Sequence, residues 1–251
     1  MEKSARTLIV TGASRGIGAA TAILAAKQGY AVAVNYRTER ARADEVVARI
    51  KAGGGKAVAI AGDVADEKDV IALFDAAERA FGPIGALVNN AGITGPVGRV
   101  ENLERKTLEL LLAVNVTGAV LSAREAVRRM STTRGGAGGA IVNVASRASE
   151  LGAPGTWVPY ALTKGAIDTF TRGLAYEVAR EGIRVNAVSP GLIDTEIHGP
   201  AGGAERLKKL GPGVPMGRPG TAEEVAEAAV WLLSPAASYI TGAILPVSGG
   251  R

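Results

Sequence analysis

The sequence predicts an α/β protein in which a doubly wound parallel sheet of about seven strands carries helices on both faces. Short apolar segments alternate with amphipathic segments along the whole chain, and the connections between them are short. This alternation is typical of β–α–β crossovers and therefore of a parallel sheet. A glycine-rich turn directly after the first apolar segment agrees with it. The 251 residues, 47% of them hydrophobic, suffice for one large domain, 1–251.

The individual elements follow from periodicity and from the residues that end them. Strands are predicted at 8–10, 30–34, 56–61, 86–88, 140–144, 183–188 and 243–247. Helices are predicted at 19–28, 39–52, 67–81, 103–130, 158–180 and 223–233. The glycine-rich segment 132–139 is interpreted as a flexible loop. The Gly- and Pro-rich segment 192–220 is interpreted as a mobile substrate-covering segment with one short helix.

Composition excludes several classes of site and partner. The formal charge is +5, but Lys and Arg are scattered among acids, which indicates a mixed solvated surface and no nucleic-acid partner. The absence of cysteine excludes disulfides and thiolate chemistry, and a single histidine, His198, excludes a multi-histidine metal site, so no metal is expected. Neither an uninterrupted apolar run of 18 residues nor a signal-peptide pattern is present, so we expect a cytoplasmic protein without membrane contact.

The glycine-rich turn, residues 11–18, opens the first helix. Gly12, Gly16 and Gly18 leave space at the helix N-terminus, where unpaired N–H groups and a partial positive charge favour a phosphate. The alternative is a tight connection without a ligand. Ligands of open parallel sheets lie beyond the carboxyl ends of the strands. Polar residues and glycines follow the predicted strands at 35–37, 63–64, 89–92, 146 and 189–191, which predicts a site there.

Tyr160 and Lys164 lie four residues apart in a predicted helix and therefore on one face of it. A tyrosine has a pKa near 10, and bringing it near neutrality takes about 4 kcal/mol of phenolate stabilisation. A nearby ammonium group supplies part of that stabilisation. Ser146, just past a strand end, would hold a substrate oxygen. On spacing alone, simple packing on a helix surface is an equally good interpretation of the pair.

The motifs taken together strongly resemble the short-chain dehydrogenase/reductase family. They are, in chain order, T-G-x-x-x-G-x-G, the run Asn89-Asn90-Ala91-Gly92, Ser146, Y-x-x-x-K at 160–164 and Pro190-Gly191. The resemblance extends from Leu8 to Gly250. It implies a Rossmann-type domain that binds a nicotinamide dinucleotide and transfers a hydride between it and a carbonyl or secondary alcohol.

The resemblance also implies a role for each matching residue. Tyr160 would be the general acid in reduction and the base in oxidation, Lys164 would lower its pKa, and Ser146 would orient the substrate oxygen. Asn115 would hold a water that links Lys164 to solvent; otherwise it would bond its own helix backbone. The implied cofactor contacts are Gly12, Ser14, Arg15, Gly16, Ile17, Gly18, Asn35, Tyr36, Arg37, Asp63, Val64, Asn90, Ala91, Gly92, Tyr160, Lys164, Pro190, Gly191, Ile193 and Thr195.

The end of the second strand predicts that NADP(H) is preferred over NAD(H). An acidic residue there normally binds the ribose 2′-hydroxyl of NAD and repels a 2′-phosphate. The expected position is Tyr36, between Asn35 and Arg37, and holds no acid. Arg15 and Arg37 would bind the phosphate from two sides. The alternative is that both arginines are ordinary surface residues.

The substrate pocket is expected between Ser146, Tyr160 and the segment 192–220. Candidate lining residues are Thr94, Arg147, Leu151, Trp157, Leu192, His198 and Met216. Arg147 would meet an anionic substrate or lie on the surface, and His198 is interpreted as a solvated loop residue. The fold itself does not select a substrate.

Several functions remain open on the sequence. The 3-oxoacyl thioester reductases are the closest broad likeness, but Glu181 would repel an acidic carrier protein. A reductase of small carbonyl compounds is therefore favoured, with sugar or polyol dehydrogenase activity next. A non-catalytic NADP(H)-binding redox sensor is the alternative of another class. The resemblance also implies a homotetramer with contacts through 103–130, 158–180 and the last strand.

Overall fold

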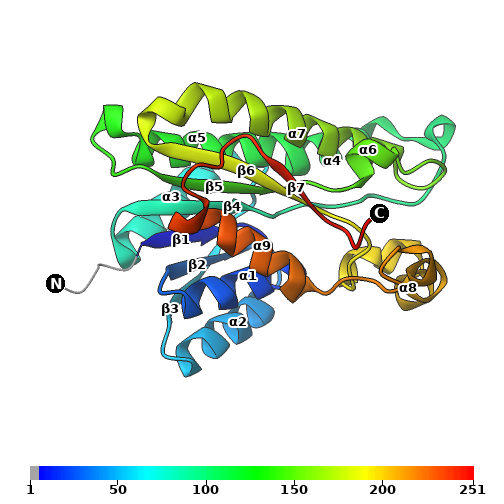
Figure 1. Cartoon of the computed structure of the whole chain (residues 1–251), viewed down its shortest axis with the longest axis horizontal. Coiled ribbons are helices and arrows are strands. Elements are labelled where there is room, and N and C mark those ends of the chain that lie inside the picture. The colour runs from blue at the N-terminus through cyan, green and yellow to red at the C-terminus, as the bar shows by residue number, and fades with distance from the viewer. Residues whose placement is uncertain (1–5) are drawn as a thin grey trace.

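Seven parallel strands form one sheet in the computed structural model, which describes residues 6–251 apart from the side chains of His198 and Pro200 (Figure 1). The strand order is β3-β2-β1-β4-β5-β6-β7. The strands are β1 (Thr7–Val10), β2 (Ala31–Tyr36), β3 (Lys56–Ala61), β4 (Ile84–Asn89), β5 (Gly139–Val144), β6 (Ile183–Pro190) and β7 (Ile244–Val247). The predicted fold class is confirmed.

Helices connect the strands. They are α1 (Gly16–Lys27), α2 (Arg40–Ala52), α3 (Glu67–Phe81), α4 (Arg105–Leu112), α5 (Gly118–Met130), α6 (Ala148–Leu151), α7 (Val158–Val178), α8 (Gly203–Leu210) and α9 (Ala222–Leu233). Short 3₁₀ helices occur at Val100–Asn102, Thr132–Arg134, Ala179–Glu181, Glu196–Ala201, Gly211–Gly213 and Pro235–Ala237. The four-residue helix α6 was not predicted, because four residues carry no helical periodicity.

The helix predicted at 103–130 is not a regular α-helix. A π-helical turn, Ala113–Thr117, separates α4 from α5. Such turns are rare and often occur at functional sites. The combined segment Arg105–Met130 is also long and apolar enough to span a membrane by length and composition, and half of its most apolar window is buried. Its α5 part packs on β4 and α3.

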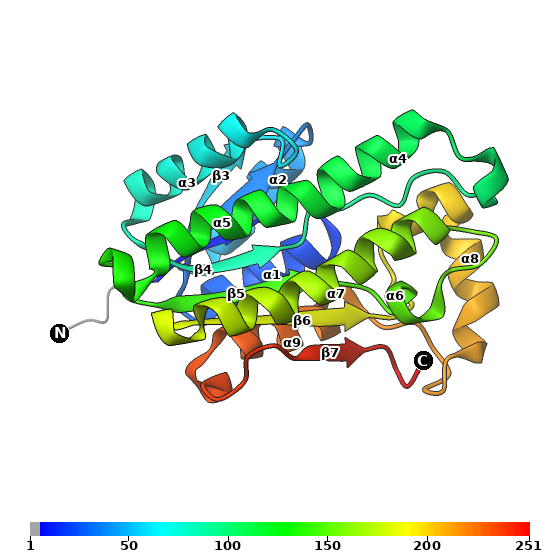
Figure 2. The same cartoon turned by 90° about the horizontal axis from the view of Figure 1, so that it is seen from above.

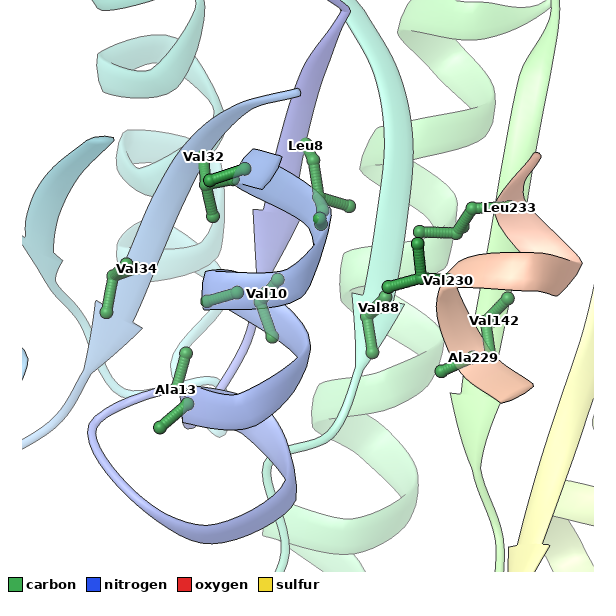
Figure 3. Close-up of a cluster of buried hydrophobic side chains, with 14 of the residues drawn as sticks. Leu8, Val10, Ala13, Val32, Val34, Val88, Val142, Ala229, Val230 and Leu233 are labelled. Atoms are coloured by element: carbon green, nitrogen blue, oxygen red, sulfur yellow. The ribbon is translucent and has the colours of Figure 1, made fainter. Parts of the chain in front are cut away.

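The strands are apolar without alternation because both faces of the sheet are covered. Leu8, Val10 and Val32 point to the layer of α1, α2 and α9 (Figure 3). Ile9 and Leu87 belong to the opposite core, which packs against α3, α5 and α7 (Figure 2). The site elements therefore stand on a sheet whose central side chains are fully buried.

The strand order reverses beside β1. β1 pairs with β2 on one side and with β4 on the other, so the connections after β1 and β4 diverge to opposite faces and leave a crevice between them. The glycine turn follows β1, and residues 90–92 follow β4. A chain of buried amides stiffens the neighbouring region. In it Asn89 Nδ2 donates to Asn143 Oδ1 and Asn143 Nδ2 donates to Thr171 Oγ1 on α7.

Candidate functional site

The glycine turn packs closely against the residues that follow β4. Gly12 has φ +60° and Gly16 has φ +54°, both in the region that favours glycine. A Cβ on Gly18 would lie 2.4 Å from Asn90 Nδ2. Asn90 Nδ2 donates to the carbonyl oxygens of Thr11 and Gly12, each at 2.9 Å. These contacts fix the turn against β4.

The first turn of α1 fits a dinucleotide phosphate. Its N-cap residue, Arg15, is extended and provides no side-chain cap, and the first turn of the helix contains no acid. The backbone N–H groups at this end therefore remain available, and the glycines prevent side chains from covering them. The residues present thus match the implied cofactor at its pyrophosphate.

Two adjoining cavities extend from this turn along the carboxyl ends of the strands. The first, the adenosine cavity, lies among Arg15, Arg37, Asp63 and the residues after β4. The second, the reaction cavity, has a volume of about 190 Å³ and contains Ser146, Tyr160 and Lys164. Five residues line both: Ile17, Asn90, Gly92, Thr195 and Ile197. The two cavities therefore form one elongated groove.

Tyr160 and Lys164 project from α7 into the reaction cavity. Lys164 is only 5% exposed, its Nζ donates to Val144 O at 2.6 Å, and it lies 5.7 Å from the centre of the Tyr160 ring. Burial lowers the pKa of Lys164 to about 8, against a smaller opposing effect of Asp168. Burial raises the pKa of Tyr160, and its hydrogen bond with the Ser146 side chain partly offsets this. The site thus favours a protonated tyrosine.

Asn115 connects the π-helical turn to the catalytic face of α7. Its side chain accepts from Ile93 N and donates to Ile93 O, each at 2.8 Å. It also donates to Thr163 Oγ1 at 3.0 Å, and Thr163 in turn donates to Tyr160 O. The Asn115 side chain therefore makes its hydrogen bonds to Ile93 and Thr163 and not to the backbone of its own helix. It lines neither cavity and lies behind Gly92.

Arginines gather at the adenosine end of the groove. Arg37 lies 3.6 Å from Asp63, and Arg15 lies 3.2 Å from Glu196. Arg42, on the first turn of α2, bonds Glu196 at 2.7 Å. All three guanidinium groups are well exposed. Arg15 and Arg37 line the adenosine cavity together with Tyr36, the last residue of β2, and Arg42 is connected to it through Glu196.

The structure places most predicted residues on the groove. Every predicted cofactor contact except Gly18 lines one of the cavities, whereas Gly18 packs beneath Asn90. Asn35 lines the adenosine cavity but is buried and binds backbone, accepting from Gly12 N and donating to Gly62 O. Roles toward a ligand remain predictions for all of them.

Among the expected substrate-pocket residues, Thr94, Arg147, Leu151, Trp157 and Leu192 line the reaction cavity. Met216 does not, and that prediction is wrong. The Gly-Pro turns return this stretch toward the chain end, where Met216 N bonds Gly249 O at 3.1 Å and the side chain is 66% exposed. The side chain of His198 lies outside the described part of the structure.

Sequence reasoning missed the residues that reach the groove from a distance. Arg42 and Glu196 meet across 154 positions. Arg206 and Arg251 enter the reaction cavity from α8 and from the chain end. No local spacing signals these contacts. A count of arginines near the covering segment could have raised Arg206 as a candidate.

Comparisons with known proteins show which family this chain is similar to over nearly its whole length. Residues 12–251 match the family model described as enoyl-(acyl carrier protein) reductase. YgfF, an uncharacterized oxidoreductase of Escherichia coli, is 52% identical over 97% of this chain and 98% of its own. Glucose 1-dehydrogenase 2 of Bacillus subtilis is 40% identical over 98% and 94%. A 3-ketoacyl-(acyl-carrier-protein) reductase from Brucella melitensis, crystallised with NADH, superposes with a TM-score of 0.90 at 35% identity, covering 98% of each chain.

Proposed function

Because the chain belongs to the short-chain dehydrogenase/reductase family and is an oxidoreductase of the CH–OH/C=O type, we propose that it interconverts a small carbonyl compound and its alcohol with NADP(H). Tyr160 is the general acid or base. The observation that carries this proposal is the gathering of Ser146, Tyr160 and Lys164 in a cavity that continues into the glycine turn.

In reduction, Ser146 and Tyr160 hold the substrate oxygen through their hydroxyl groups, and Tyr160 gives its proton to that oxygen. The raised pKa of Tyr160 keeps this proton in place until the substrate is bound. NADPH, when bound, supplies the hydride. In oxidation, Tyr160 removes the hydroxyl proton instead. The Lys164 ammonium, held by Val144 O, stabilises the phenolate that this requires. Asn115 positions α7, the helix that carries Tyr160 and Lys164, through its hydrogen bond to Thr163.

Replacing Tyr160 tests the catalytic assignment against the sensor alternative. Tyr160→Phe should lower kcat by orders of magnitude and leave NADPH binding within about twofold, because only the hydroxyl is lost. The matched control is Tyr239→Phe, since Tyr239 is fully exposed. Steady turnover by the Tyr160→Phe enzyme would sink the assignment. Lack of turnover by the native protein with every carbonyl and alcohol tried would favour the sensor.

Preference for NADP(H) is supported by Arg15, Arg37 and Arg42 around the expected 2′-phosphate position and by Tyr36 as the last residue of β2. Hydrogen bonds from an arginine to a phosphate are charge-assisted and therefore stronger than hydrogen bonds between neutral groups. The kcat/KM with NADPH should exceed that with NADH on the same substrate, and Arg37→Asp should shift the ratio toward NADH. A native enzyme that prefers NADH would overturn the preference and leave the oxidoreductase assignment intact.

Sugar or polyol oxidation is the second candidate function. The likeness to a relative named glucose 1-dehydrogenase, at 40% identity over nearly the full length of both chains, favours it. A screen of ketones, aldehydes and acetoacetyl thioesters with NADPH, and of sugars and alcohols with NADP⁺, distinguishes these substrates. Glu181, which accepts a hydrogen bond from the Ser131 hydroxyl, precedes the amino end of β6, whereas the reaction cavity lies beyond the carboxyl ends of the strands. Its position therefore gives no reason to expect thioesters to be the poorer substrates, and the screen decides between them.

We further propose a cytoplasmic homotetramer. Large apolar side chains are exposed on the long helices, among them Leu110 on α4 and Leu162 and Tyr176 on α7. Light scattering after size-exclusion chromatography should give four times the chain mass of 25.5 kDa. Leu162→Glu should lower that mass, because a charge would be buried at the interface.

A further inference from the structure

We propose that the substrate carries an anionic group and that Arg206 binds it. This inference rests on the proposed function, because it places the anion beside the carbonyl or alcohol held by Ser146 and Tyr160. It concerns residues of the covering segment to which the sequence motifs assign nothing.

Arg206 lies one aromatic ring away from the catalytic tyrosine. Its guanidinium carbon is 5.0 Å from the centre of the Trp157 ring. The same Trp157 ring meets the Tyr160 ring edge-on, with centroids 6.4 Å apart and planes at 65°. Arg206 and Tyr160 line the same cavity. A molecule that fills this cavity can therefore contact both residues.

The charged side chains that line the reaction cavity are all positive. Its lining includes Arg147, Lys164, Arg206 and Arg251, and none of the lining residues is an Asp or Glu. Arg147 is neutralised, because its Nη1 lies 2.7 Å from Glu150. Lys164 is committed to Val144 O and the catalytic face. The main-chain oxygen of Arg251 accepts a second hydrogen bond from Arg147, from its Nε at 2.8 Å. Arg206 forms no ion pair among the described residues.

Stacking on Trp157 does not satisfy the hydrogen-bonding groups of the Arg206 guanidinium. Its Nε is buried and has no hydrogen-bond partner, which is rare for a buried polar group. Burial, together with the charge of Arg251, lowers the pKa of Arg206. Arg218, also in the covering segment, is the contrast, because it forms two hydrogen bonds with Glu224 and faces solvent. An anion would give Arg206 the partner that Arg218 already has.

The other residues that line the cavity indicate the size and polarity of the rest of the substrate. Leu151, Leu192 and Ile197 line the same cavity as Arg206 and the catalytic hydroxyl groups. Together with the volume of about 190 Å³, this fits a short apolar skeleton with an oxo or hydroxyl group at one position and a carboxylate or phosphate at another. The class is that of small oxo acids, hydroxy acids and sugar phosphates.

Matched pairs of charged and neutral substrates test the proposal. With NADPH, 4-oxopentanoate is compared with its methyl ester, and with NADP⁺, glucose 6-phosphate is compared with glucose, all at low ionic strength. In at least one pair, kcat/KM of the charged member should be higher by about tenfold to a hundredfold. The pair in which the charged member is preferred shows whether the bound anion is a carboxylate or a phosphate.

The variant Arg206→Gln should remove that preference. We expect KM of the charged substrate to rise by at least about tenfold, with KM of its neutral partner within about twofold. Arg206→Lys should retain part of the preference, since it keeps the charge but not the planar fork. The control is Lys209→Gln, which removes one positive charge from the exposed face of the same helix. Equal kcat/KM within both pairs, or an equal loss for both members in Arg206→Gln, would overturn the proposal.

A binding measurement separates this proposal from the function on which it rests. In thermal unfolding without turnover, hexanoate should stabilise the native protein more than methyl hexanoate, and Arg206→Gln should abolish the difference. Stabilisation of this kind without oxidoreductase turnover would refute the proposed function and keep the anion site. Turnover of neutral substrates without any Arg206-dependent anion effect would refute the anion site and keep the function.

Discussion

Glu196 of the covering segment accepts hydrogen bonds from Arg42 Nη1 at 2.7 Å and from Arg15 Nη1 at 3.2 Å. The hydrogen bond with Arg42 is the largest of the effects that lower the pKa of Glu196. A carboxylate thus lies between two of the three arginines that we assign to the 2′-phosphate of NADP(H). A phosphate in the same place would have to displace it.

Removal of this carboxylate should therefore favour NADPH. In Glu196→Gln, we expect KM for NADPH to fall by about two- to fivefold, a modest change because the ion pairs are exposed. KM for NADH should stay the same, because NADH has no phosphate to compete. Glu205→Gln, an exposed acid of α8, is the control. An equal effect on both cofactors would show that Glu196 acts on the covering segment and not on phosphate binding.

The buried Lys164 predicts a pH-dependent stability of the cofactor-free protein. Its pKa is about 8 when folded, against 10.5 as the ordinary value, so the unfolded chain binds more protons between these pH values. The free energy of unfolding therefore rises with pH through this window. In urea titrations between pH 7 and 10, the native protein should gain on the order of 2 kcal/mol relative to Lys164→Met. Exposed Lys209→Met should track the native protein; parallel curves for Lys164→Met and the native protein would contradict the lowered pKa.

The sequence predicted those features that local pattern determines. The glycine turn and the polar residues after each strand are local, because a parallel sheet brings its carboxyl ends to one edge whatever the helices do. Tyr160 and Lys164 share a face through helical spacing alone. Their order along the chain, not any single motif, identified the family.

The sequence could not predict features that depend on contacts between distant segments. The π-helical turn at Asn115 has no compositional signal, and it forms where that side chain binds Ile93 and Thr163 from outside its own helix. Glu196 and Arg206 reach the groove through the fold of a Gly- and Pro-rich segment whose path is not periodic. Met216 was misplaced for the same reason.

Asn115 should be a positioning residue. Asn115→Ala leaves the backbone groups of Ile93 without partners, and we expect a loss of about 1–3 kcal/mol in the free energy of unfolding. Because the link to Thr163 and Tyr160 is also lost, kcat should fall while KM for NADPH changes little. Asn143→Ala removes a comparable buried amide away from the groove and should lower stability with kcat retained. Equal kcat in the two variants, at matched stability, would show that Asn115 is only structural.

Gly18 and Gly173 should respond in opposite directions to replacement by alanine. At Gly18 the added methyl would lie 2.4 Å from Asn90 Nδ2 and 2.7 Å from Gly12 O, so the turn must open and lose its bonds to β4. Gly18→Ala should weaken NADPH binding by at least about tenfold and lower the melting temperature.

At Gly173, on the exposed side of α7, a Cβ meets no atom within 4 Å. In the Leu162→Glu background, in which the proposed subunit contact along the same face of α7 is lost, Gly173→Ala should raise the free energy of unfolding by about 0.5–1 kcal/mol through the helix preference of alanine, with NADPH binding unchanged. Fluorescence titration with NADPH and thermal unfolding measure both effects. Native-like NADPH affinity in Gly18→Ala would mean that the turn tolerates the shift and does not depend on its contact with Asn90.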